Sequence, residues 1–148
     1  MKISLACDHG ALVLKIRLKE YLIREGYEVV DCGTNDTDSC DYPDYGYKAC
    51  KLVQSGECDR AIVMCTTGIG MSIVANKVRG IRCALVENPN IARLTREHND
   101  SNCLALGACL SDFDTTKKIV DVWLTTPFSN GERHQRRIDK IRDIEDNE

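Results

Sequence analysis

The sequence of 148 residues predicts a single α/β domain, residues 1–148, in which helices flank both faces of a five-stranded parallel sheet. Short apolar runs rich in β-branched residues recur along the chain, and segments with helical periodicity follow them. The runs are nearly continuous in apolar residues, as strands buried on both faces of a parallel sheet are. Because strand and helix alternate without a linker, repeat or low-complexity segment, we expect a doubly wound, Rossmann-like arrangement.

Five segments are expected to be strands. Each carries an apolar run, and in chain order they are residues 2–8, 27–33, 60–66, 82–87 and 103–107. Right-handed crossovers between parallel strands place all the carboxyl ends at one edge of the sheet. Ligands of such sheets bind outside that edge, so the residues there are the first candidates for a functional site.

The first helix is expected over residues 10–25. Leu12, Ile16 and residues 21–23 form an apolar stripe at helical spacing, and Gly26 is placed to end the helix. A helix at 72–78 is also expected, directly after a glycine-rich loop.

Two later helices carry start signals. Asn88 is a suitable N-cap and Pro89 suits the first helical position. Another helix is expected to start at Ser111, with Asp114 three residues on in a variant of the capping box, and to end before Pro127.

The last segment, residues 131–148, is amphipathic. Ile138, Ile141 and Ile144 recur at helical spacing, and no strand follows. A terminal helix of this kind either caps its own domain or packs on a partner.

Composition excludes several classes of protein. A hydrophobic content of 43% with 29% charged residues is typical of a soluble globular chain. The net charge of −3 gives no reason to expect nucleic acid as a partner. The N-terminus does not resemble a signal peptide, and no apolar segment approaches the roughly 18–20 residues of a membrane helix. We therefore expect a cytoplasmic protein without a membrane partner.

The nine cysteines are odd in number and never form a CxxC pair, so they do not indicate a structural zinc site. Most are expected to be small buried hydrophobes. Cys7, His9, Cys65 and His98 could in principle hold a metal, but no ligand spacing supports this, and we expect no metal.

Three segments are expected at the functional edge. Residues 7–10 (Cys-Asp-His-Gly) end the first strand, and residues 65–70 (Cys-Thr-Thr-Gly-Ile-Gly) end the third. Residues 98–100 (His-Asn-Asp) end the helix that begins after Asn88, and we place them at the same edge. Two of the three histidines in the chain would then lie there.

The glycine loop is not a known nucleotide fingerprint. Gly68 and Gly70 lack a third small residue at position 73, and no Gly-Lys-Ser/Thr follows. A tight loop remains, whose amides would stabilise an anion at the start of a helix. A thiol beside such amides can act as a base. Alternatively, Cys65 merely ends a buried strand.

The other candidate residues each have a structural alternative. His98 suits proton transfer near neutral pH, but a helix C-terminus also favours histidine. Asp8 could simply be an N-cap. Arg133, Arg137 and Lys140 share one helix side, which suits either gripping a phosphate or a solvated face.

Several motifs together resemble one family, the type B ribose-5-phosphate isomerases, which also include the galactose-6-phosphate isomerase subunits. The motifs span the chain and are CDHG, YEVVDCGT, DYPDYG, GECDRAIVMCTTGIGMSIVANKV, REHNDSN and GERHQRRI. The resemblance implies dimers or pairs of dimers, active sites completed by the neighbouring subunit, and a C-terminal helix that packs on it. It also implies an aldose–ketose isomerase of a phosphorylated sugar, working without metal or cofactor.

The resemblance assigns roles to the candidate residues. Cys65 looks like the base that moves a proton between C2 and C1 of the open-chain sugar. Another branch of the family uses a glutamate at the position of Met71, which cannot take a proton. Thr67 and the amides of the loop would hold the enediolate oxygens, and the loop residues concerned are Thr66, Thr67, Gly68, Ile69 and Gly70.

The remaining roles concern ring opening and phosphate. His98 would assist ring opening with Asp8 nearby, and Asn99 would bind sugar hydroxyls. The phosphate pocket would consist of His9, Arg133, His134 and Arg137, some of them from a second subunit.

Two positions depart from the family. Thr66 replaces a usual glycine, which narrows the loop, and Cys109 stands where a phosphate-binding arginine is typical. Ribose 5-phosphate is the expected substrate. The alternatives are a hexose 6-phosphate such as allose or galactose 6-phosphate, or a non-catalytic module that binds a sugar phosphate.

Overall fold

A computed structural model describes residues 1–148 and places five strands in one sheet, in the order β2-β1-β3-β5-β4. The strands are β1 (Lys2–Cys7), β2 (Glu28–Asp31), β3 (Arg60–Cys65), β4 (Cys83–Leu85) and β5 (Cys103–Gly107). All neighbouring pairs are parallel, so the predicted five-stranded parallel sheet is confirmed. Each expected strand is present, although most are shorter than the apolar run that predicted them.

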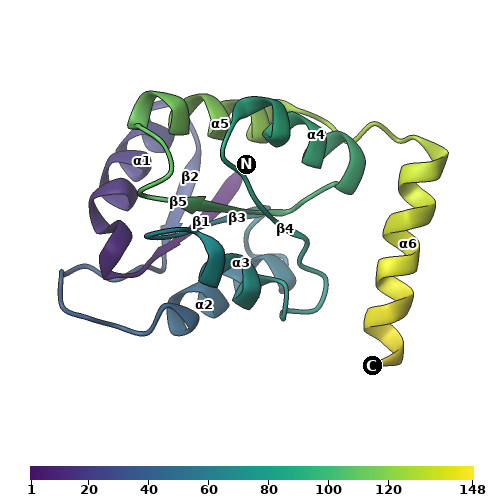
Figure 1. The fold of residues 1–148 in the computed structure, drawn as a ribbon, viewed down its shortest axis with the longest axis horizontal. Coiled ribbons are helices and arrows are strands. Elements are labelled where there is room, and N and C mark those ends of the chain that lie inside the picture. Colours follow the sequence, from purple (N-terminus) through teal and green to yellow (C-terminus); the bar gives the residue numbers. More distant parts are fainter.

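Helices cover both faces of the sheet (Figure 1). They are the short 3-10 helix η1 (His9–Ala11) and the α-helices α1 (Leu12–Arg24), α2 (Tyr42–Gln54), α3 (Ile69–Ala75), α4 (Pro89–Asn99), α5 (Phe113–Thr125) and α6 (Glu132–Asn147). Side chains of α1, α4 and α5 bury one face around Trp123, whereas α2 and α3 bury the other. Leu5 and Ala6 are consecutive in β1, face opposite cores and are both fully buried. The central strands are thus buried on both sides.

The helix starts agree only in part with the sequence-based expectations. The carboxamide of Asn88 accepts a hydrogen bond from the Ile91 amide at 3.0 Å, as predicted for an N-cap. The N-cap of α5 is Asp112, which accepts from the Thr115 amide at 2.7 Å, so the prediction of a start at Ser111 was one residue early. The helix after the glycine loop covers residues 69–75, and the expected range of 72–78 was wrong.

Helix α1 buries a different stripe from the one predicted. Leu12, Leu18 and Leu22 are buried, but Ile16 and Ile23 face solvent. Lys15 is fully buried because its ammonium forms an ion pair with Asp31 at 3.0 Å and donates to the Thr34 carbonyl. A charged residue with such partners can occupy a buried position that periodicity alone would assign to an apolar residue.

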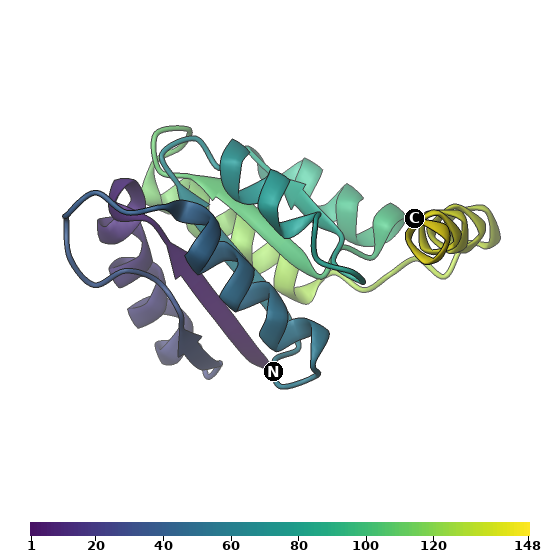
Figure 2. The same ribbon diagram turned by 90° about the horizontal axis from the view of Figure 1, so that it is seen from below.

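Helix α6 stands to one side of the body in two perpendicular views (Figures 1 and 2). Its far end is tied to the loop before β4 by an ion pair between Arg79 and Asp146, and by the Gly80 amide, which donates to Glu145 at 2.9 Å. A cavity of about 790 Å³ separates α6 from the body, and Ile141 and Ile144 line it. No helix is both long and apolar enough to cross a membrane.

Candidate functional site

Two groups of candidate residues lie at opposite edges of the sheet. The first, called the thiol half-site, lies at the carboxyl edge and consists of Asp8, His9, residues 65–70 and Cys109. The second, called the histidine half-site, lies near the end of α4 and the start of α6 and consists of His98, Asn99, Arg133, His134 and Arg137.

Cys65 is the last residue of β3 and is 6% exposed. Its sulfur accepts a hydrogen bond from the Gly68 amide at 3.1 Å. The thiol therefore ends a buried strand, as the structural alternative predicted, and its sulfur also lies against the glycine loop. An amide aimed at the sulfur stabilises negative charge there, which suits a residue that gives up and takes back a proton.

The glycine loop turns sharply into α3. Gly68 has a φ of +77°, a conformation that favours glycine, and α3 begins at the next residue. The Ile69 amide donates to the Thr67 hydroxyl at 3.3 Å. The Gly68 and Ile69 amides thus donate within the loop, to the Cys65 sulfur and to the Thr67 hydroxyl.

Asp8 acts as the N-cap of η1. Its carboxylate accepts a hydrogen bond from the Gly10 amide at 2.9 Å, and the residue is buried. This confirms the structural alternative for Asp8, whose other carboxylate oxygen makes no hydrogen bond within the chain.

His9 is exposed at the same edge. Its Nδ1 accepts from the Cys40 amide at 3.2 Å, so in the neutral ring the proton sits on Nε2. His9 also lines a cavity of about 310 Å³ together with Arg17 and Thr37. The ring therefore offers an N–H donor at the mouth of the site.

The two departures from the family lie side by side. The Cys109 amide donates to the Thr66 carbonyl at 3.0 Å, and both side chains are exposed. The hydroxyl of Thr66 approaches Gly10 so closely that a side chain at position 10 would collide with it. Thr66 therefore fills the space beside Gly10, and Cys109 borders the same edge without supplying a charge.

Sequence reasoning missed two neighbours of the thiol half-site. The ring of Tyr42, the first residue of α2, lies so close to Gly70 that a side chain there would collide with it. Cys40 positions His9 through its backbone amide. Tyr42 belongs to the motif DYPDYG, which could have drawn attention to it. Met71 is fully buried beside Gly46 and cannot serve as a base.

The histidine half-site is held together by ring contacts and a hydroxyl. The rings of His98 and His134 have centroids 4.4 Å apart at an angle of 39°. His134 Nδ1 lies 2.8 Å from the Ser129 hydroxyl. Burial lowers the pKa of His134, and the nearby positive charges of His98, Arg133 and Arg137 lower it further. The contact with His98 therefore favours a neutral His134 ring.

Arg133 and Arg137 lie exposed on the first turns of α6. Arg133 and His134 line a cavity of about 510 Å³ between α6 and the segment before it. Two exposed guanidinium groups next to an imidazole can bind a phosphate.

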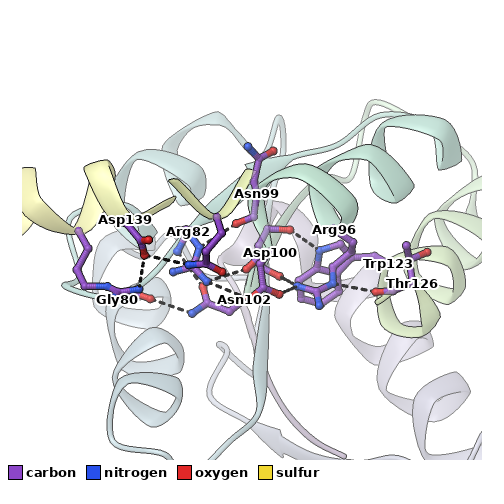
Figure 3. Close-up of polar contacts among 12 residues, drawn as sticks. Gly80, Arg82, Arg96, Asn99, Asp100, Asn102, Trp123, Thr126 and Asp139 are labelled. Atoms are coloured by element: carbon purple, nitrogen blue, oxygen red, sulfur yellow. Dashed lines mark hydrogen bonds and ion pairs between the residues drawn. The ribbon is translucent and has the colours of Figure 1, made fainter. Parts of the chain in front are cut away.

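His98 and Asn99 do not lie at the carboxyl edge, and the prediction that placed them there was wrong. The Asn99 carbonyl accepts a hydrogen bond from Arg82, just before β4, as Figure 3 shows. The Ala61 amide, at the start of β3, donates to the Asn102 carbonyl at 3.0 Å. A helix after a parallel strand runs back across the sheet, so its C-terminus lies at the amino edge.

The length of β3 separates the two half-sites. Five residue steps from Arg60 to Cys65 correspond to about 17 Å of strand. Cys65 and His98 of one chain are therefore too far apart to act on one sugar. The same separation rules out the metal site of Cys7, His9, Cys65 and His98.

The chain is similar to known proteins along its length. A family model described as Ribose/Galactose Isomerase matches residues 3–141. The structure of ribose-5-phosphate isomerase B from Clostridium thermocellum is 50% identical, covers 99% of both chains and has a TM-score of 0.97. Ribose-5-phosphate isomerase B of Escherichia coli is 42% identical, over 97% of this chain and 96% of its own.

A third relative carries a ligand. The structure of ribose-5-phosphate isomerase B from Mycoplasma genitalium, described with bound ribulose 5-phosphate, is 39% identical, covers 98% of this chain and 96% of that one, and has a TM-score of 0.92. With matches of this extent, the chain belongs to the ribose/galactose isomerase family, among the type B ribose-5-phosphate isomerases.

Proposed function

We propose that this protein interconverts ribose 5-phosphate and ribulose 5-phosphate, with Cys65 as the base, in active sites that two copies of the chain build together. The relatives named ribose-5-phosphate isomerase B support the reaction, as does the Mycoplasma relative with ribulose 5-phosphate. The observation that carries the mechanism is the Cys65 thiol, which ends the buried strand β3 with an amide donor 3.1 Å from its sulfur.

Ring opening comes first, because only the open chain has an acidic proton beside a carbonyl. The anomeric hydroxyl loses its proton, the bond between C1 and the ring oxygen breaks, and the ring oxygen takes up a proton. His98 suits this exchange because imidazole both accepts and donates protons near neutral pH. Asp8 lies at the thiol half-site and would work opposite His98.

Isomerisation follows at Cys65. The thiolate removes the proton from C2, the electron pair forms the C1–C2 double bond, and the carbonyl oxygen on C1 becomes an enediolate oxygen. The thiol returns a proton to C1, the proton of the C2 hydroxyl passes to the enediolate oxygen on C1, which becomes a hydroxyl, and C2 becomes the ketone. Thr67 and the remaining donors of the 66–70 loop would stabilise the enediolate.

Substrate binding would draw on both half-sites. Asn99 would contact the sugar hydroxyls, and His9, Arg133, His134 and Arg137 would surround the phosphate. His9 belongs to the thiol half-site and the other four to the histidine half-site, so a second copy must supply the latter. The approximately 17 Å length of β3 supports this arrangement.

Helix α6 would pack on the neighbouring copy. Ile141 and Ile144 are 47% and 63% exposed, and the adjoining cavity of about 790 Å³ leaves room for another surface. The thiol half-site exposes Ile69 and Ile73 beside the glycine loop. Burying such side chains is favourable, at roughly 25 cal/mol per Å² of apolar surface.

One assay tests the reaction and separates it from its alternatives. We would incubate the protein in deuterium oxide with ribose 5-phosphate, allose 6-phosphate or galactose 6-phosphate. Deuterium at C1 or C2 is expected to appear fastest with ribose 5-phosphate. Faster incorporation into a hexose phosphate would assign a hexose substrate, and binding without incorporation would show a non-catalytic module.

A further inference from the structure

The segment that carries His98 and Asn99 ends in an unusual backbone conformation. Asp100 follows directly and has φ 45° and ψ 47°, in the left-handed region that residues other than glycine rarely adopt. Its carboxylate meets two arginines, with one oxygen 2.8 Å from Arg96 and the other 3.5 Å from Arg82. Two ion pairs therefore stabilise this turn, in addition to the helix that it ends.

Both arginines also hold the backbone of this turn (Figure 3). Arg82 donates to the Asn99 carbonyl and to the Asp100 carbonyl, each at 2.9 Å. Arg96 donates to the Ser101 carbonyl at 2.6 Å. Three consecutive carbonyls, of residues 99–101, thus have guanidinium donors, which fixes the direction of the chain as it leaves α4.

The same contacts connect the turn to the core. The Arg96 side chain is 6% exposed, and its Nε donates to the Thr126 carbonyl at the end of α5. The indole of Trp123, in the core, donates to the Ser101 hydroxyl at 2.9 Å. The turn therefore moves with the body of the domain, even though α6 stands apart from it.

The side chain of Asn99 points away from this network. In Figure 3 its amide extends away from the two guanidinium groups, and it makes no hydrogen bond within the chain. We infer that Arg82, Arg96 and Asp100 form a clamp that positions His98 and Asn99 for ring opening in the site of a second copy. This inference rests on the proposed function, and the three are positioning residues that touch no substrate.

The test compares a substrate that must open its ring with one that cannot form a ring. The measured quantity is kcat/KM for ribose 5-phosphate divided by kcat/KM for a four-carbon aldose phosphate. A displaced His98 should lower this ratio, whereas general damage to fold or assembly lowers both values together. We expect Arg82→Gln and Asp100→Asn each to lower the ratio by about tenfold or more. His98→Asn should lower it in the same way.

Arg93→Gln is the matched control, because it removes an exposed ion pair with Glu97 on the same helix. We expect it to change the ratio by less than about twofold. Asp100→Asn tests the clamp even where Arg82→Gln loses its fold, since asparagine tolerates the left-handed conformation. If His98→Asn lowers the ratio but a folded Arg82→Gln or Asp100→Asn protein does not, the clamp is wrong and the proposed function still stands. A wild-type protein that does not isomerise ribose 5-phosphate would overturn the proposed function and the clamp with it.

Discussion

The thiol half-site and the histidine half-site are held in place by different means. Cys65 is the end of a central strand, and hydrogen bonds within one continuous loop fix its sulfur. His98 and His134 come from two helices that meet at the rim, and arginines and a serine hold their surroundings. The end of one strand and the loop that follows it determine the first geometry, whereas the second depends on contacts between separate helices and, as we propose, on assembly. Variants of the two half-sites should therefore fail in different ways.

The largest effect is expected at the thiol half-site. Cys65→Ala should lower kcat by about 10²- to 10⁴-fold, because it removes the proposed general base, while the melting temperature changes little. Cys50→Ala is a suitable control, since Cys50 is also buried in the same core but lies on α2, away from the loop. Steady-state kinetics of both variants would measure this difference. A loss of kcat below tenfold for Cys65→Ala would argue against Cys65 as the base.

At the histidine half-site the effect should fall on binding. Arg137→Ala removes a charge-assisted contact to phosphate of about 1.5–3 kcal/mol, so we expect KM to rise roughly 10- to 100-fold with kcat less affected. Arg142→Ala, on the same helix and paired with Asp139, should leave KM unchanged. Equal KM values for the two variants would show that Arg137 does not contact the phosphate.

Both effects concern residues that the sequence identified, although it placed His98 and Asn99 at the wrong edge of the sheet. The order of strands and helices was predictable because buried parallel strands leave continuous apolar runs, as in β3. The thiol at the end of β3 followed from the same reasoning. The place of His98 does not follow from this reasoning, because His98 lies at the end of a helix, and a helix after a parallel strand ends at the opposite edge of the sheet.

Other features depend on contacts that periodicity cannot reveal. Lys15, on α1, is buried because its ammonium pairs with Asp31, at the end of β2, and donates a hydrogen bond to the Thr34 carbonyl. The clamp on the His98 segment brings together Arg82 and Arg96, which only the tertiary fold makes neighbours. The hydrogen bond from the Gly68 amide to the Cys65 sulfur depends on how the loop folds back, which a sequence pattern does not show.

A smaller effect, a gain in affinity for the substrate, is expected from placing a positive charge at the thiol half-site. Cys109→Arg would place a guanidinium beside the Thr66 carbonyl, at the edge that His9 borders. We expect KM for ribose 5-phosphate to fall by about tenfold, and the gain to shrink as salt is added. Cys109→Gln offers similar length without charge and should give no gain. An unchanged KM in a folded Cys109→Arg protein would mean that this position does not face the phosphate.

The smallest effect concerns the stability of the histidine half-site at acid pH. Burial and neighbouring positive charge lower the pKa of His134, so the unfolded chain binds a proton more readily than the folded one. The stabilising contribution is present above the unfolded pKa of about 6.5 and is lost as pH falls through the lower folded value. When the pH is lowered from 7.5 to 5, the melting temperature of the wild type should fall by more than that of His134→Gln. Parallel losses in the two proteins would contradict this.

The separation of the half-sites is tested most directly by mixing two inactive variants. Cys65→Ala and His98→Asn would be purified separately, then unfolded together in equal amounts and refolded. In a symmetric dimer with shared sites, half of the molecules are hybrids, and each hybrid has one site with both residues intact. The mixture should therefore regain about a quarter of wild-type activity. If each chain carried a complete site, the mixture would show no more activity than the two variants alone, and that result would contradict the shared site.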